Sequence, residues 1–230
     1  MLYFIRGINE VDSALDKVGL YDFFGVFLSG MLMVVVSFYL DLPLMNLIEN
    51  TDNDIINVIL FMLESYFLGL ILQEASSAID KKCFKFREKA RSNFLNDNNK
   101  IIDNELELKS FRELANKILS IQDNNHVYSK DENEYVYYQC KTFLETCGKS
   151  DKVNRINSLY AMSRSLIVSL SLCLIAYFIC NIKSLGVQNF IVIFIIVLLI
   201  LIFYRRTKRF STYKVRVILR HYKILNENNT

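Results

Sequence analysis

The chain has 230 residues, 52% of them hydrophobic, with a single proline and seven glycines. Few helix breakers and long apolar runs are typical of an all-helical protein. The net charge of +3 is too small to indicate a nucleic-acid or acidic partner by itself, so the distribution of charge along the chain is more informative.

Residues 1–19 come before the first long apolar stretch. Within them, residues 9–18 are expected to form a short helix lying at the membrane surface. Arg6 and Lys17 are mixed with acidic residues and no small-residue cleavage site is present, so we expect no cleavable signal peptide.

Four apolar stretches predict four transmembrane helices arranged as two hairpins. A helix of about 20 apolar residues crosses about 30 Å of hydrocarbon. The first three stretches approach or reach that length, and the fourth is shorter. They comprise residues 20–39, 55–72, 164–182 and 190–204.

The expected fold class is all-α: an integral membrane protein with four transmembrane helices and a cytoplasmic helical stalk-and-cap domain. Five segments follow from this division. They are an interfacial N-terminal helix (1–19), a first transmembrane hairpin (20–74), a cytoplasmic helical domain (75–163), a second transmembrane hairpin (164–204) and a basic cytoplasmic tail (205–230).

The lysines and arginines are distributed asymmetrically around these stretches. The loop 41–54 contains none, and the loop between the third and fourth stretches contains only Lys183, whereas both cations are frequent after the second and fourth stretches. Because short cytoplasmic loops carry an excess of lysine and arginine, we expect both termini and residues 75–163 to be cytoplasmic.

Residues 75–163 are expected to form two stalk helices joined by a two-helix cap. No breaker occurs over residues 70–94, so the second span is predicted to continue into the cytosol. A second cap helix runs over residues 132–147 and stops at Gly148, and Ser150 begins a helix that continues into the third span. The first cap helix has an apolar stripe of Leu108, Phe111, Leu114, Ala115, Ile118 and Leu119.

The C-terminal tail gives two conflicting signals. Residues 213–219 alternate like a strand, but they follow a transmembrane stretch without a breaker, which favours a helix.

Glu64 lies in the middle of the second span, with Asn57 about two turns earlier on the same helix face. A charge at the bilayer centre costs at least about 2–3 kcal/mol, so such residues normally face a bundle interior or water. Two interpretations remain: Asn57 and Glu64 line or gate a cation path, or Glu64 is protonated and bonds to a neighbouring helix.

Small residues indicate helix interfaces on the first span (Gly25, Ser29 and Gly30) and on the second (Ser65 and Gly69). The third span has a longer row of small residues that includes Ser165 and Ser169, which are candidates for the same path.

Arg164 stands at the cytoplasmic end of the third span, at a depth similar to that of Asp22 and Glu74. An interhelical ion pair with one of these acids is one interpretation. The other is that Arg164 extends to lipid phosphates. Neither arrangement implies catalysis.

Two basic clusters flank the spans, and each has two interpretations. They satisfy the positive-inside rule and would bind anionic lipid headgroups without any further role. Alternatively, with neighbouring aromatic side chains for stacking, they would bind a nucleotide or oligonucleotide. The candidate residues are Lys81, Lys82, Lys85, Arg87, Arg91, Arg205, Arg206, Lys208 and Arg209.

The motifs of common enzyme and cofactor sites are missing from the sequence. It contains no phosphate-binding P-loop, no GxGxxG, no HExxH and no GxSxG. Five cysteines form no CxxC pair and the two histidines are isolated, so we expect reduced thiols and no metal site. We therefore expect neither an enzyme nor a cofactor.

Two short segments carry a family resemblance. The segment Leu20-Tyr21-Asp22-Phe23-Phe24-Gly25, followed by Ser29-Gly30, resembles the opening of small four-span proteins found beside bacterial antiphage genes. Those proteins often have Pro-Gly where this chain has Ser29-Gly30. The stretch from Tyr138-Gln139-Cys140 to Gly148, with Arg155 and Arg164 before a span, is similar to their second hairpin.

The resemblance is to membrane effectors of antiphage defence, including the channel-forming Hailong type. It implies a homo-oligomeric ion channel in the bacterial inner membrane. It further implies that a single-stranded DNA or nucleotide ligand, made by a partner nucleotidyltransferase, acts at the cytoplasmic face. Channel opening during infection would then depolarise the cell. No individual ligand contact follows from the resemblance.

The leading functional hypothesis is therefore a homo-oligomeric, ligand-gated membrane pore, with a tetramer favoured, that acts as a growth-arresting effector. The alternative is a non-conducting anchor or adaptor that recruits a cytosolic partner through residues 111–119 or through the tyrosine face of the second cap helix (Tyr135, Tyr137 and Tyr138). A third hypothesis is a lipid-binding or lipid-remodelling protein.

Overall fold

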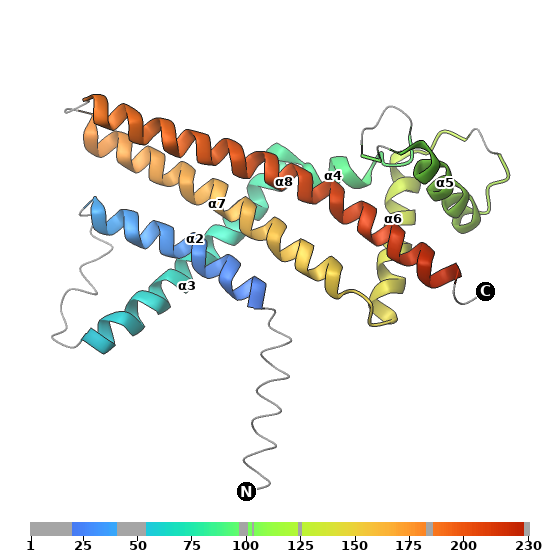
Figure 1. The fold of residues 1–230 in the computed structure, drawn as a ribbon, viewed down its shortest axis with the longest axis horizontal. Helices are drawn as coiled ribbons and strands as arrows, with labels where there is room; N and C mark the ends of the chain where they lie inside the picture. Colours follow the sequence, from blue (N-terminus) through green and yellow to red (C-terminus); the bar gives the residue numbers. More distant parts are fainter. Residues whose placement is uncertain are drawn as a thin grey trace, which may run out of the picture. The chain divides into compact units, whose positions relative to one another are not determined.

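The structure is a computed structural model that describes residues 20–40, 54–96, 101–102, 104–123, 126–182 and 186–227. Every regular element in these ranges is helical, which confirms the all-helical expectation there (Figure 1). The surface helix expected at residues 9–18 lies outside the described residues. The elements are α2 (Leu20–Tyr39), α3 (Asp54–Ile79), the π-helical turn η2 (Asp80–Phe84), α4 (Phe86–Arg91), α5 (Glu105–Leu119), α6 (Lys130–Thr146), α7 (Asp151–Asn181) and α8 (Val187–Glu227).

Three helices are long and apolar enough to cross a membrane. They are α3 together with η2 (Asp54–Phe84), α7 (Asp151–Asn181) and α8 (Val187–Asn226). The first expected span corresponds to α2, whose described side chains form a shorter apolar helix over Phe23–Tyr39. The structure thus gives three long apolar helices and one shorter one.

The chain divides into two compact units. The first, which we call the apolar unit, comprises Met1–Ile79 and Ser158–Arg206. The second, the polar unit, comprises Asp80–Asn157 and Thr207–Thr230. Both α7 and α8 therefore contribute residues to each unit.

In the apolar unit, α2 crosses α3 (Figure 1), and Gly30 and Gly69 lie where their backbones come closest. A Cβ atom built on Gly69 would lie 2.1 Å from the carbonyl oxygen of Val26, so no larger residue fits without moving backbone. Ser29 and Ser65 are fully buried beside the crossing. This confirms the interface predicted from the small residues, because close backbone approach is what holds helices together in lipid.

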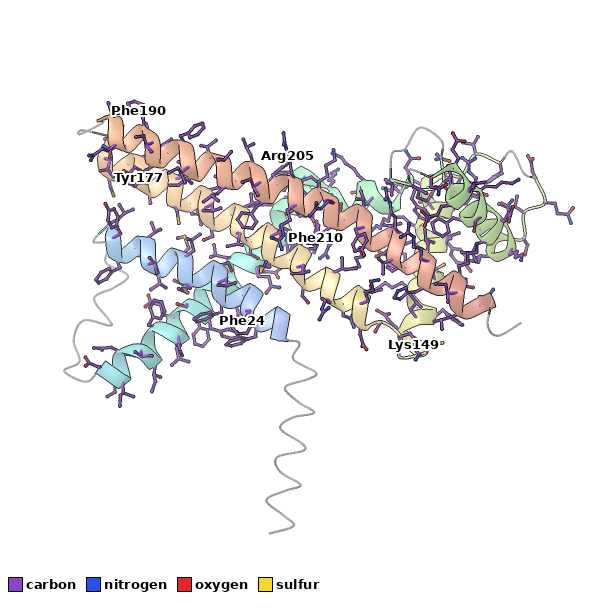
Figure 2. All side chains as sticks on the ribbon, in the orientation of Figure 1. Phe24, Lys149, Tyr177, Phe190, Arg205 and Phe210 are labelled. Carbon is purple, nitrogen blue, oxygen red and sulfur yellow. The ribbon has the colours of Figure 1, made fainter. Side chains whose placement is uncertain are left out.

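Helix α8 presents its apolar surface outward within the single chain. None of the residues in its most apolar segment is buried. Where α7 ends and α8 begins, the hydroxyl of Tyr177 on α7 donates to Asn189 Oδ1 on α8 at 2.8 Å. Figure 2 shows Tyr177 and Phe190 at that shared end. The exposed apolar surface suits contact with lipid or with another apolar helix.

The polar unit has its own hydrophobic core. It includes the apolar stripe of α5, where Phe111 and Ala115 are almost fully buried. The apolar stripe is therefore filled by packing within the chain and offers no free apolar face to a partner. Other core residues are Phe94, Leu95, Val136, Cys140, Leu144, Val153, Ile156, Val215, Ile218 and Leu219.

The end of α8 belongs to this core. The helix continues to Glu227, which confirms the helical expectation for the tail. Val215, Ile218 and Leu219 are at most 2% exposed, and Tyr222 packs against them. This i, i+3, i+4, i+7 spacing is a helical stripe. It overlaps the alternating pattern of residues 213–219, which explains why the sequence looked like a strand.

Local capping fixes the short helices of the polar unit. Ser129 and Glu132 form a reciprocal capping box at the start of α6. Gly148 follows α6 with a φ of 64°, a conformation that glycine adopts without steric cost, which confirms the predicted stop. Asn104 accepts a hydrogen bond from the amide of Leu106 and caps α5.

The stalk predicted over residues 70–94 is not one continuous helix. Beyond α3 the chain forms the π turn, then breaks at Lys85, which has a φ of 53°. The amide of Lys85 donates to the carbonyl oxygen of Asp80 at 2.7 Å, and the buried Asp80 carboxylate accepts from the amide of Phe86 at 3.2 Å. A side chain thus replaces a helical acceptor, so the helix ends without glycine or proline.

Candidate functional site

Glu64 is the acidic residue on the apolar face of α3, and its side chain is partly exposed. Its Oε2 atom is shielded from solvent and has no hydrogen-bond partner among the described residues. Among the described residues, no neighbouring helix therefore provides a hydrogen bond to Glu64 Oε2. An apolar helix that presents an acidic group in this way needs water, a cation or a second protein chain beside it.

Asn57 lies two turns before Glu64 and is likewise partly buried. The next residue after Glu64, Ser65, is fully buried at the crossing with α2. The carboxyl is therefore attached next to the close backbone contact between α2 and α3. Any change in the packing of α2 on α3 would move it.

Ser165 and Ser169 of α7 are buried between helices. The hydroxyl of Ser169 donates to the carbonyl oxygen of Ser29 on α2 at 3.0 Å. The hydroxyl of Ser165 donates to the carbonyl oxygen of Ala161 at 2.9 Å and lies 3.5 Å from the hydroxyl of Ser76 on α3. In this arrangement both serines hold α7 against α2 and α3, and neither is hydrogen-bonded to Glu64.

Arg164 is only 4% exposed and contacts α3. Its Nε donates to Ser76 Oγ at 3.0 Å, and its Nη2 lies 3.5 Å from the carbonyl oxygen of Gln73. The guanidinium also lies 5.6 Å from the ring centre of Tyr160. The interpretation that Arg164 extends to lipid phosphates is therefore wrong for this fold.

The structure describes the side chain of only one of the two acids proposed as partners of Arg164. Glu74 is exposed on α3 and forms no ion pair with any described residue. The side chain of Asp22 lies outside the described residues. One of the contacts of Arg164 is with Ser76, a partner that no sequence pattern indicated.

The basic residues named from the sequence fall into two groups by exposure. Arg91 is engaged inside the polar unit: its Nε lies 3.2 Å from Glu134 Oε1, and its Nη1 donates to the hydroxyl of Tyr138 at 2.7 Å. Arg87 is partly buried and donates to Asn157. The exposed members are Lys81, Lys82, Lys85, Arg205, Lys208 and Arg209, of which Arg205 is labelled in Figure 2, and Arg206 is partly exposed.

Sequence reasoning missed a second polar cluster, centred on Asn157. Its Oδ1 accepts from Arg87 Nη2 at 3.3 Å and from Lys214 Nζ at 3.0 Å. Lys214 lies beyond the apolar segment of α8, inside the polar unit. The local sequence carries no signal for this cluster, because the burial of Ser211 and Ile218, the neighbours of Lys214 on the helix, is seen only in the structure.

Burial is the main cause that lowers the pKa of Lys214, to about 8. The positive charges of Arg87, Lys141 and Arg91 lower this pKa further, and Glu145 acts against them. Glu145 is itself paired with Lys141 at 3.2 Å. The cluster thus concentrates positive charge where it is poorly solvated.

Three side chains of the α8 tail hold α5 and the residues before it. Arg216 donates to the carbonyl oxygen of Ile101, and Lys223 donates to Ser110 Oγ. Between them, Arg220 Nη2 donates to Glu107 Oε2 at 2.8 Å, and its Nε bonds the other carboxylate oxygen. A two-pronged arginine–carboxylate pair fixes orientation as well as distance.

Within the described ranges, no three His, Cys, Asp or Glu side chains gather closely enough to hold a metal ion. No protein-family model matches the chain, and neither a curated protein nor a solved structure matches it.

Proposed function

We propose that the chain is one subunit of a homo-oligomeric, gated pore in the bacterial inner membrane. In this proposal α2 crosses the membrane as well as the three longer helices α3, α7 and α8. The pairs α2–α3 and α7–α8 then form two hairpins. The excess of lysine and arginine after the second and fourth spans supports a cytoplasmic polar unit and cytoplasmic termini.

The observation that carries the proposal is the carboxyl of Glu64. It lies on a long apolar helix, and its Oε2 is shielded from solvent and has no hydrogen-bond partner among the described residues. Leaving such a group in hydrocarbon costs at least about 2–3 kcal/mol. Contact with water and cations at an oligomer axis removes that cost, and a ring of glutamates favours cations.

Gating is supported by the two helices, α7 and α8, that belong to both units. Both α7 and α8 continue without a break from the apolar unit into the polar unit. A rigid helix that belongs to two units passes a rotation or shift of one to the other. In the apolar unit, α7 contacts α3 through Arg164 and Ser76, and α3 carries Glu64.

A role as a growth-arresting effector in antiphage defence follows from the short motifs at residues 20–30 and 138–164. An open cation pore in the inner membrane dissipates the membrane potential, and this would be enough to stop growth. Expression in bacteria should then depolarise cells, as followed with a potential-sensitive dye.

The direct test is cation flux from liposomes containing the purified full-length protein. We expect Glu64→Gln to lower the preference for cations over anions. Glu74→Gln is the matched control, because Glu74 is an exposed acid on the same helix. If the wild type conducts and Glu64→Gln leaves its selectivity unchanged, Glu64 does not line the pore. A monomer in mild detergent without flux under any condition would favour the anchor or adaptor instead.

A further inference from the structure

Helix α8 carries one exposed face from its apolar segment into its basic segment. Phe194, Leu198 and Leu201 are 66%, 47% and 54% exposed. Arg205 and Lys208 follow with the same alternation of four and three residues, and both are exposed. Because residues three or four positions apart lie on one side of a helix, these five side chains form a single row. All five belong to one unbroken helix, so their spacing is that of the helix itself.

The change from apolar to basic residues in this row occurs at Tyr204. This side chain is 39% exposed, and tyrosine is enriched where a helix leaves the hydrocarbon of a membrane. Lys208 is four residues further on, which is about 6 Å along a helix axis. The headgroup layer on each side of a bilayer is roughly 5–8 Å thick, so Arg205, Lys208 and Arg209 start at its depth. Figure 2 labels Phe190 and Arg205, which stand at the two ends of the apolar segment.

The protein supplies no negative charge to these three exposed cations. Between Val187 and Asn226, α8 contains neither aspartate nor glutamate. Arg205, Lys208 and Arg209 form no ion pair with any residue that the structure describes. Their counter-charge must therefore come from outside the chain.

We propose that the exposed face of α8 binds an anionic phospholipid. The acyl chains lie along Phe194, Leu198 and Leu201, and the headgroup phosphate accepts hydrogen bonds from Arg205, Lys208 and Arg209. We call these three cations the headgroup site.

The apolar half of the row selects a lipid over a soluble anion. None of the residues in the most apolar segment of α8 is buried, so this surface needs an apolar partner along its whole length. A nucleotide or oligonucleotide would satisfy the cations and leave the apolar half uncovered. A phospholipid covers both, because its phosphate is joined directly to its acyl chains.

The charge of the site selects an anionic headgroup over a zwitterionic one. Both kinds carry a phosphate, but the amine of phosphatidylethanolamine would lie beside three cations with no acid of α8 to pair with. Phosphatidylglycerol has no amine and keeps a net negative charge. Basic side chains next to a membrane attract anionic lipids by about a factor of five for each lysine or arginine.

Binding is measured by native mass spectrometry of the full-length protein in neutral detergent, which counts the lipids that stay bound. Phosphatidylglycerol is the probe, and phosphatidylethanolamine with the same acyl chains is the reference. The variant that removes the site carries Arg205→Gln, Lys208→Gln and Arg209→Gln. Lys208→Gln alone is the second variant, to be used if the triple variant does not fold.

The matched control removes three positive charges elsewhere in the polar unit. It carries Lys109→Gln, Lys117→Gln and Lys149→Gln. All three lysines are exposed, and none follows an apolar helix (Lys149 is labelled in Figure 2). This control separates the position of the charges from their number.

We expect phosphatidylglycerol to bind the wild type at lower concentration than phosphatidylethanolamine. The concentration for half occupancy should rise at least about tenfold in the triple variant and about fivefold in Lys208→Gln, and the control should match the wild type. No preference for phosphatidylglycerol, or an equal rise in the control, overturns the proposal. Adducts with a short single-stranded oligonucleotide that the triple variant loses, without any with phosphatidylglycerol, overturn it in favour of a nucleic acid.

This inference rests on α8 crossing a membrane, which the proposed function also assumes, but it does not require a pore. Protein that binds phosphatidylglycerol at the headgroup site and conducts no ions would contradict the pore alone. Protein that conducts ions and shows no lipid preference would contradict the headgroup site alone.

Discussion

Gly30 of α2 and Ser65 of α3 meet backbone against backbone: a Cβ atom on Gly30 would lie 1.7 Å from the carbonyl oxygen of Ser65. Ser65 is the residue after Glu64, so the contact that fixes the crossing also fixes the position of the acidic side chain. Of the residues the structure describes, the glycines at this crossing set how close the two helices can come.

Gly30→Ala should therefore separate α2 from α3. Because the added methyl group meets backbone and not a flexible side chain, we expect a loss of about 1–3 kcal/mol or more in stability. Thermal unfolding in detergent measures it. Gly186→Ala is the control, since no atom lies within 4 Å of a Cβ there. Equal Tm values for the two variants would contradict the close crossing.

Ser76→Ala should destabilise the contact between α3 and α7. The substitution removes the acceptor of Arg164 Nε, and a buried charged donor that loses its acceptor costs about 1–3 kcal/mol. Ser163→Ala is the matched control. Ser163 is also buried, but its hydroxyl bonds only within its own helix, to the carbonyl oxygen of Leu159.

The two serine variants are compared by thermal unfolding of the full-length protein. Ser76→Ala should lower Tm clearly more than Ser163→Ala. A smaller effect of Ser76→Ala would mean that Arg164 does not depend on this hydroxyl.

Features set by local pattern could be predicted from the sequence. The stop at Gly148 and the stripe of α5 follow from residue type and helical period alone. The interface at Gly30 and Gly69 follows from the small residues that close helix packing requires. Each of these signals lies within a few residues of the structure that it determines.

Features set by tertiary partners could not be predicted. Arg164 bonds Ser76, 88 positions away, and Asn157 joins Arg87 to Lys214. Nothing in the local sequence distinguishes these partners from other polar residues. The break at Lys85 depends on which group the Asp80 carboxylate accepts from, so a search for glycine or proline does not find it.

Lys85→Gly should stabilise the polar unit. Lys85 has a φ of 53°, where a side chain costs roughly 1–2 kcal/mol that glycine does not pay. Part of this gain is offset by the greater freedom of glycine in the unfolded chain, so we expect a net gain of about 0.5–1 kcal/mol. The measurement is chemical denaturation in detergent.

Lys82→Gly provides the opposite case. Lys82 is exposed like Lys85 but lies inside the π turn, where glycine only adds freedom to the unfolded chain. We expect Lys82→Gly to lower the free energy of unfolding by about 1 kcal/mol. Both variants remove one positive charge, so opposite signs can only come from backbone conformation. A loss of stability in both would show that the strain at Lys85 is not relieved by glycine.

Lys214→Met should stabilise the protein, and the gain should depend on pH. The pKa of Lys214 is lowered from 10.5 to about 8 in the folded state, mainly by burial. Below pH 8 the lysine is charged in both the folded and the unfolded state, and the folded state is destabilised by the full cost of burying this charge. Above pH 10.5 it is neutral in both and the cost disappears, so the wild type gains stability between these values as pH rises.

The full shift corresponds to about 3 kcal/mol at about 1.4 kcal/mol for each pH unit. Because Lys214 is partly exposed and keeps its bond to Asn157, we expect about 1–2 kcal/mol in favour of Lys214→Met at pH 7. The difference in stability between Lys214→Met and the wild type should shrink as pH rises from 8 to 10. Lys149→Met is the control variant, because Lys149 is an exposed lysine of the polar unit. A gain for Lys214→Met that is constant with pH would come from better packing alone, and would remove the evidence that a charged ammonium group is confined there.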